Sequence, residues 1–278
     1  MASIRQYRNK IKTAKNIAKI TRAMEMVAAS RMRSAQLQAE MSRSYSDGIV
    51  NLASVLHNQI DPDVHELLKT NISSQKNLFV LIAPEKGLCG GLLTNIARFL
   101  LSIEAKNADY IAIGNKSKSI AAKLHANILA DFSIGLSRPK YEIVPPIARI
   151  VKDSFLSGKY AKVVAVYPQY VTTMTQEPVF KILLPLNLIS ENQAASPNSF
   201  VIEPSVGEIT ESLLNIYLET TLYHFLLEAY ASEQSARMVA MKNATDNADG
   251  LIGDLTIEYN QARQTNITNE IIDIGYAR

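Results

Sequence analysis

Proline is absent from both ends of the chain. The protein has 278 residues and ten prolines, and all ten lie between Pro62 and Pro204. A proline in a helix interior costs about 3 kcal/mol, so long stretches without proline can form long unbroken helices. Residues 1–61 and 205–278 are two such stretches. We therefore expect two long terminal helices around a middle part that is rich in turns.

Cysteine is also scarce, and histidine is scattered. The single cysteine, Cys89, excludes an intramolecular disulfide and a cysteine-rich zinc site. The four histidines show no HxxxH or HExxH spacing, which argues against a zinc hydrolase. The sequence has no apolar run long enough to cross a bilayer, and no apolar segment follows its basic start as in a secretory signal.

Charge is divided unevenly between the two ends. The net charge is +3, but residues 1–61 carry 10 Lys/Arg against 4 Asp/Glu, whereas residues 205–278 carry 4 against 11. Most of the basic side chains of the first segment form one run: Arg5, Arg8, Lys10, Lys12, Lys15, Lys19 and Arg22. Such a run can bind nucleic acid or an acidic protein surface, or it can be a solvated helix face.

Apolar spacing supports the terminal helices. Residues 3–57 are predicted to form one helix with Ser3 as N-cap, and small or apolar residues recur every three or four positions. These are Ile4, Tyr7, Ile11, Ala14, Ile17, Ile20, Met24 and Val27, followed by Ala35, Met41, Tyr45, Ile49, Leu52 and Leu56. Residues 208–273 carry a heptad seam that includes Met241, Thr245, Ala248, Ile252, Leu255, Tyr259 and Ala262.

The middle of the chain alternates strand and helix patterns. Strands are predicted at residues 77–83, 109–114, 127–132, 161–173 and 177–189, with helices at residues 92–106, 116–126 and 145–160. This alternation predicts a small, mostly parallel α/β domain of Rossmann-like type. A polar linker at residues 190–205 leads back into the last helix.

The predicted fold is therefore α/β with a long coiled coil, in which two terminal helices form an antiparallel coiled coil around the inserted α/β domain. The expected domains are residues 1–60, 75–190 and 206–278. The opposite charges of the two helices favour their pairing, although exposed ion pairs contribute only about 0–1 kcal/mol each.

A glycine turn, Gly87–Gly91, follows the first predicted strand and precedes a helix, where nucleotide-binding loops often lie. It lacks the GxGxxG spacing and the Gly-Lys-Ser/Thr of a phosphate-binding loop. The simpler reading is a tight turn in which Cys89 is a small buried residue. A nucleotide-dependent enzyme, a coiled-coil protein that binds nucleic acid and a coiled-coil interaction protein without an active site are thus the alternatives.

Three segments resemble one known family. IRQYRNKIKTAKNIAKITRAMEMVAASRMRSAQ (4–36), GLCGGL (87–92) and ASEQSARMVAMKNATDNADGLIGDLTIEYNQARQTNIT (231–268) are similar to the gamma subunit of F-type ATP synthases of bacterial type. The resemblance implies a non-catalytic central-stalk rotor subunit. Its partners would be the alpha and beta subunits around the shaft, the epsilon subunit and the c-ring, with no cofactor or metal of its own and no nucleic acid.

The same resemblance implies contact residues. Arg263, Gln264 and Thr268 match positions that engage a catch loop on beta, and Met24 with Arg22 matches the shaft position near an acidic segment of beta. Two further residues, Glu203 and Phe200, match positions at the c-ring.

The chain also departs from the family. It has Pro84-Glu85-Lys86 where an Asp-Arg or Asp-Lys pair usually precedes GLCG, so the family's salt contacts at this turn are not carried over to this chain. Cys89 has no second cysteine for the thiol control of chloroplast gamma subunits. No transit peptide precedes the first helix, and we expect a peripheral protein on the cytoplasmic face of the bacterial inner membrane.

Overall fold

The computed structural model describes residues 4–57, 66–69, 74, 76–103, 108–135, 137–186 and 206–276. The chain divides into two compact units, which are described one at a time. The helix-pair unit consists of Met1–Ser30 with Arg237–Arg278, and the sheet unit consists of Arg31–Ala236.

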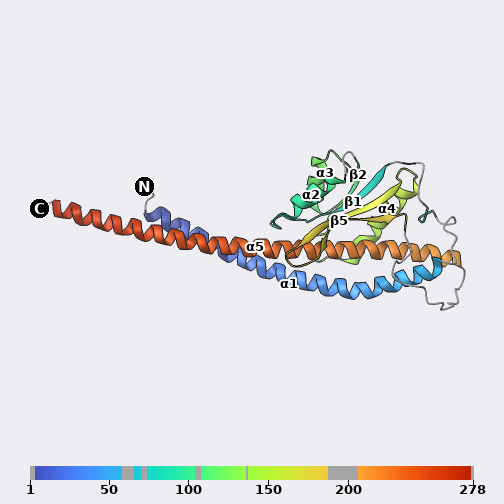
Figure 1. The fold of residues 1–278 in the computed structure, drawn as a ribbon, viewed down its shortest axis with the longest axis horizontal. Coiled ribbons are helices and arrows are strands. Elements are labelled where there is room, and N and C mark those ends of the chain that lie inside the picture. Colours follow the sequence, from blue (N-terminus) through green and yellow to red (C-terminus); the bar gives the residue numbers. More distant parts are fainter. Residues whose placement is uncertain are drawn as a thin grey trace. The chain divides into compact units, whose positions relative to one another are not determined.

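Two long helices form the ends of the chain, as predicted. The first helix, α1, spans Ile4–His57 and the last, α5, spans Val206–Tyr276 (Figure 1). Neither contains a proline, which is why backbone hydrogen bonding continues through 54 and 71 residues. The proposed cap Ser3 and the predicted linker at 190–205 lie outside the described residues.

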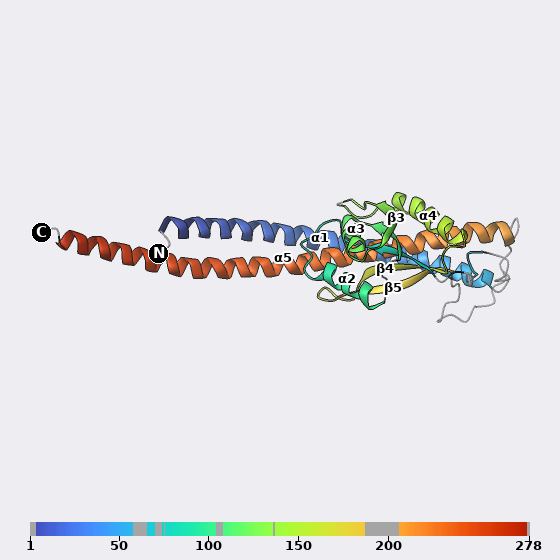
Figure 2. The same ribbon diagram turned by 90° about the horizontal axis from the view of Figure 1, so that it is seen from above.

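In the helix-pair unit the two helices run antiparallel (Figures 1 and 2). The buried seam on α5 consists of Met241, Thr245, Ala248 and Leu255, which confirms the heptad prediction there. The residues of α1 that are buried opposite them are small: Ala14, Ala18 and Ala28. Small side chains let the two backbones approach closely, and the packed stripe is consequently narrow.

The apolar pattern predicted for α1 is partly wrong. Ile17, Ile20 and Val27 are 48%, 60% and 50% exposed, whereas Ala18 is buried. After a step of three from Ile11 to Ala14, the predicted list moves by three residues twice more, to Ile17 and to Ile20, where the observed seam moves by four to Ala18. A step of three residues turns about 300° around a helix, so two such steps end about 120° short of two full turns. The predicted apolar stripe therefore moves away from the partner helix. The observed seam keeps to alternate steps of four and three and stays on one face.

The sheet unit contains five strands in the order β3-β2-β1-β4-β5. The strands are β1 (Asn77–Ile82), β2 (Asp109–Ile113), β3 (Asn127–Phe132), β4 (Lys162–Tyr170) and β5 (Gln176–Leu184). The first four are parallel and β5 is antiparallel to β4. This confirms the mostly parallel α/β domain, although the last two strands are shorter than predicted.

Helices cover both faces of this sheet. They are α2 (Leu92–Ser102), α3 (Asn115–Lys123) and α4 (Val144–Leu156), the last preceded by the short helix η1 (Tyr141–Ile143). Phe79 and Leu81 of β1 face the core formed with α2 and α3, whereas Leu78, Val80 and Ile82 face the core formed with α4 and α5. The alternation of side chains along β1 therefore separates two hydrophobic cores.

The compact units cut across both long helices and do not follow the predicted domains at residues 1–60, 75–190 and 206–278. Those bounds, which follow the secondary structure, stay a prediction. Within the described part of the chain, no helix combines the length and the apolar character that a membrane span requires.

Candidate functional site

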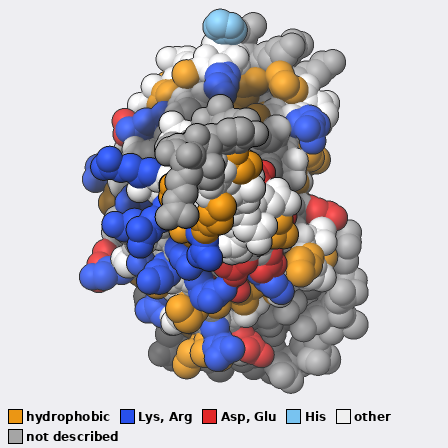
Figure 3. Space-filling view, turned by 90° about the vertical axis from the view of Figure 1, so that its left-hand side faces the viewer, with side chains coloured by type: hydrophobic (Ala, Val, Ile, Leu, Met, Phe, Trp, Pro, Cys, Tyr) orange, Lys and Arg blue, Asp and Glu red, His pale blue; other side chains and the backbone are white. Residues whose placement is uncertain are grey.

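The basic run of α1 lies on the surface of the helix-pair unit. All seven of its side chains, from Arg5 to Arg22, are exposed. Figure 3 looks onto the side where both chain ends lie, and Lys and Arg side chains are dense there. The run is thus a solvated helix face that remains available to an acidic partner.

The exposed charges of α5 in this unit are mostly negative, among them Asp246, Asp249, Asp254, Glu258 and Glu270. One of them meets α1: Arg22 Nη2 lies 2.8 Å from Asp249 Oδ2. Both side chains are about half exposed, at 60% and 49%. The pair therefore contributes little stability, and much of the Arg22 guanidinium faces solvent.

The predicted beta-contact residues fall into two groups. Arg22 is exposed and Met24 is half-buried, both in the part of α1 that pairs with α5. Arg263, Gln264 and Thr268 are all exposed on α5. Thr268 Oγ1 donates to the carbonyl oxygen of Gln264 at 2.9 Å, so these two side chains lie one turn apart. Arg263 follows Asp249, the partner of Arg22, by 14 residues, about 21 Å along the helix, and the two groups are separate.

The second group lies where α5 extends beyond α1. Thr21 is opposite Thr245, and an antiparallel register then places the start of α1 opposite Ala262. Ala262 is half-buried, whereas every side chain from Arg263 to Ile272 is exposed. Among the described residues, α5 therefore continues beyond the start of α1, and the side chains of residues 263–272 are available for contacts on every side of the helix (Figures 1 and 2).

This end of α5 also carries exposed apolar side chains. Ile267, Ile271, Ile272 and Ile274 are between 46% and 70% exposed. Exposed apolar groups of this density are typical of protein interfaces. These isoleucines are not among the contact residues predicted from the sequence, although four of them within eight residues are a usable signal.

A groove of about 390 Å³ runs along the helix pair beside the first group. Its lining is Lys15, Ala18, Lys19, Arg22, Ala23, Met26, Asp249 and Ile252. Apolar walls with basic side chains at the edge suit contact with an amphipathic or acidic surface. Met26 and Asp249 were not predicted as site residues. Met26 could have been predicted from the sequence, because it follows Arg22 by four residues and therefore lies on the same face of α1.

The predicted c-ring residues Phe200 and Glu203 lie outside the described residues, so their contacts stay a prediction. The glycine turn is the tight turn that was expected. Cys89 is buried, and Leu88 and Gly90 adopt positive φ angles of 63° and 58° between β1 and α2. Among the described residues, no group of three or more His, Cys, Asp and Glu side chains is arranged to hold a metal ion.

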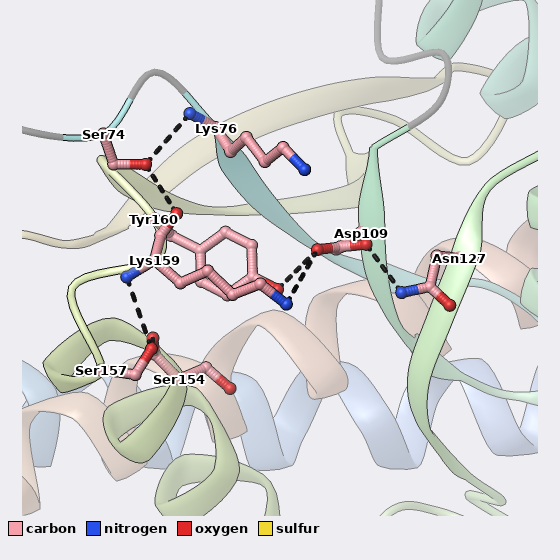
Figure 4. A network of polar contacts seen from close by, with 8 residues as sticks. All are labelled: Ser74, Lys76, Asp109, Asn127, Ser154, Ser157, Lys159 and Tyr160. Atoms are coloured by element: carbon pink, nitrogen blue, oxygen red, sulfur yellow. Dashed lines mark hydrogen bonds and ion pairs between the residues drawn. The ribbon is translucent and has the colours of Figure 1, made fainter.

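The amino end of the sheet holds a network of polar contacts around Asp109 (Figure 4). Its carboxylate accepts hydrogen bonds from Tyr160 Oη at 2.6 Å and Asn127 Nδ2 at 2.8 Å. Burial acts to raise the pKa of Asp109, but these bonds and the charges of Lys159 and Lys76 outweigh it and lower the pKa. The contacts join the starts of β2 and β3 to the chain before β4, which indicates a structural role.

Comparison with known proteins matches nearly the whole chain. The family model described as ATP synthase covers residues 3–276. The chain is 41% identical over 281 residues to the ATP synthase gamma chain of Dehalococcoides mccartyi, covering 99% of this chain and 97% of that one. It is 38% identical over 288 residues to the ATP synthase gamma chain of Akkermansia muciniphila, covering 100% and 98%.

Solved structures share the fold. A chain from the rotor of the Euglena gracilis mitochondrial ATP synthase aligns with a TM-score of 0.67 at 18% identity, covering 95% of this chain and 98% of that one. A chain from the OSCP/F1/c-ring structure of the same enzyme aligns with a TM-score of 0.72 at 19% identity, covering 99% and 93%.

Proposed function

Because this chain belongs to the ATP synthase gamma-chain family, we propose that it is the central-stalk rotor subunit of an F-type ATP synthase. It couples rotation of the membrane c-ring to ATP synthesis or hydrolysis in the beta subunits. The observation that carries this proposal is the match to gamma chains at 41% identity over 99% of the chain. The two proline-free helices suit the role, since an unbroken hydrogen-bonded helix can transmit torque.

The helix-pair unit supplies the contacts with the alpha and beta ring. Arg263, Gln264 and Thr268, exposed where α5 continues beyond the start of α1, contact a loop of beta deep in the ring. Arg22 and Met24 contact an acidic segment of beta lower on the shaft. An exposed Arg22 attracts that segment only weakly through solvent, which lets the contact break as the shaft turns.

The sheet unit and the residues before α5 face the membrane side of the complex. The epsilon subunit binds beside the α/β domain, and Glu203 with Phe200 meets the polar loops of the c-ring. The subunit itself is non-catalytic. It is a peripheral component at the cytoplasmic face of the bacterial inner membrane, held there by its partners.

Co-purification tests the proposal. The chain expressed with alpha and beta subunits should be recovered at one copy per three alpha–beta pairs, and a probe on the chain should rotate when ATP is supplied. The chain alone should not turn over ATP. Recovery as a lone protein that shifts RNA in a gel would contradict the proposal and favour nucleic-acid binding by the basic face of α1.

A further inference from the structure

The carboxyl end of β1 is occupied by a buried carboxylate. Glu85, three residues after the last residue of β1, is 8% exposed. Its Oε1 accepts hydrogen bonds from Ser133 Oγ at 2.7 Å and from the backbone N–H groups of Ile134 and Gly135 at 2.5 and 3.2 Å. Its Oε2 accepts from the backbone N–H of Asn115 at 3.2 Å, at the first residue of α3.

The donors of this site are held by backbone contacts that do not involve Glu85. Gly114 has a φ of 88°, and a Cβ there would lie 2.0 Å from the carbonyl oxygen of Ala83. Its N–H donates to the carbonyl oxygen of Phe132 at 2.8 Å, which ties the start of α3 to the end of β3. The buried Ser117 hydroxyl donates to the Gly114 carbonyl at 2.5 Å. These contacts hold the start of α3, where the Asn115 N–H lies, next to the end of β3, which the Ser133, Ile134 and Gly135 donors follow.

The Glu85 carboxylate lies at the carboxyl end of an open α/β sheet, beside the N-terminus of α3. In such sheets ligands lie at the carboxyl ends of the strands, and anions lie at helix N-termini. The order β3-β2-β1-β4-β5 reverses between β1 and β4, whereas the donors to Glu85 follow β2 and β3, so the carboxylate lies at the carboxyl ends of β1, β2 and β3 and not in the crevice at that reversal. Here the anion at this place is a side chain of the protein. Burial acts to raise the pKa of Glu85, but the four hydrogen bonds lower it overall, and the carboxylate stays ionised.

We propose that Asn115, Ser133, Ile134 and Gly135 form a binding site for one carboxylate-type anion, which the chain fills with Glu85 as an internal ligand. The internal ligand fastens the segment after β3 to the start of α3. It also closes this edge of the sheet to free phosphate, because a second anion would meet both the Glu85 charge and the occupied donors.

Chemical rescue of Glu85→Ala in the full chain tests the proposal. Truncation empties the site, so hydrogen exchange of the Asn115, Ile134 and Gly135 amides should accelerate at least tenfold. Formate, the smallest carboxylate, should restore most of this protection with saturation. It should also raise the unfolding temperature of the variant by about 2–4 °C, as a ligand that binds the native state does. Phosphate at equal ionic strength should restore less, because the donors match two oxygens of a planar anion.

Two matched variants separate site binding from a general salt effect. Glu85→Gln keeps the volume of the side chain, so the site stays filled and formate should not change its exchange rates or its unfolding temperature. Asp153→Ala removes an exposed carboxylate elsewhere, and formate should have no effect on it. Equal stabilisation of the wild type and all three variants by formate would overturn the proposal. The proposal would also be overturned if the Glu85→Ala variant, without formate, showed the amide exchange rates of the wild type. If Glu85→Ala does not fold, the test is Glu85→Gln, and a change in its amide exchange rates on adding formate would overturn the proposal.

Discussion

Thr21 Oγ1 and Thr245 Oγ1 lie 2.7 Å apart and form a hydrogen bond across the helix pair. Thr245 is 3% exposed and belongs to the seam, and its hydroxyl is also 2.9 Å from the carbonyl oxygen of Met241. A polar pair within an otherwise apolar seam favours one register of the two helices, because sliding one helix by a turn would break the hydrogen bond between the two hydroxyls. In a shaft that transmits torque, a fixed register between the two helices keeps the contact surface constant.

Replacing Thr245 by Val removes this bond and keeps the shape of the side chain. The free energy of unfolding should fall by about 1 kcal/mol, because Thr21 can still donate to the carbonyl oxygens of Ile17 or Ala18 and is not left unsatisfied. Chemical denaturation of the full chain measures the change. Thr256→Val is the matched control: it removes an exposed hydroxyl that bonds only to its own helix, and it should cost less.

Arg22→Ala separates stability from function. The Arg22–Asp249 pair is exposed, so its loss should change the free energy of unfolding by less than about 1 kcal/mol. ATP-driven proton pumping of the assembled complex should nevertheless fall if Arg22 meets an acidic segment of beta. Asp249→Asn breaks the same pair and keeps the arginine, so pumping should be preserved. An equal fall in pumping in both variants would show that pumping depends on the ion pair and not on a contact of Arg22 with beta.

The long helices could be predicted because 61 residues at one end and 74 at the other contain no proline, so no turn of either segment carries the residue that breaks helices. The seam of α1 could not be predicted, because Ala18 and Ile17 are both apolar and the sequence does not state which one faces the partner. Ala18 faces the partner helix because the close approach of the two backbones leaves room only for a small side chain. For this reason the apolar spacing of the sequence wrongly predicts that Ile17 and Ile20, which are exposed, belong to the seam.

The candidate site was predictable to different degrees. Arg263, Gln264 and Thr268 were predicted from resemblance, and their exposure follows from the unequal reach of α1 and α5. The site around Glu85 could not be found in the sequence. Its donors lie 30–50 residues from the carboxylate and three of the four are backbone N–H groups, which any residue but proline carries.

Met24→Lys places a second charge at the proposed beta contact. We expect fewer protons to be pumped per ATP hydrolysed, since a lysine there would add an attraction that resists rotation. Reconstituted vesicles measure pumping and hydrolysis together. Ser30→Lys is the control, because Ser30 is exposed, lies outside the groove and points about 120° around the helix from Met24. An equal defect in both variants would show that position 24 is not special.

Asp109→Asn should give a pH-dependent loss of stability. The folded-state pKa of Asp109 lies below its ordinary value of 3.8, so the ionised group stabilises the fold above that pH. This contribution is lost as pH falls through the lowered pKa. The variant should be less stable than the wild type by about 1–3 kcal/mol at pH 7, and the difference should shrink below pH 4. Asp131→Asn, at a carboxylate that is 52% exposed, should show a smaller difference at every pH.

Arg263→Ala combined with Gln264→Ala tests the contact at the end of α5. Both side chains are exposed and Arg263 lies beyond the last half-buried residue of the seam, so the helix pair should keep its stability and the complex should assemble normally. ATP turnover of the assembled complex should fall, because the double variant removes the charged and amide groups that would bind a loop of beta. Asn243→Ala, exposed on the paired part of α5, should leave turnover unchanged. Unchanged turnover in the double variant with normal assembly would show that beta does not use these two side chains, and would leave Thr268 and the exposed isoleucines as the candidates for the contact.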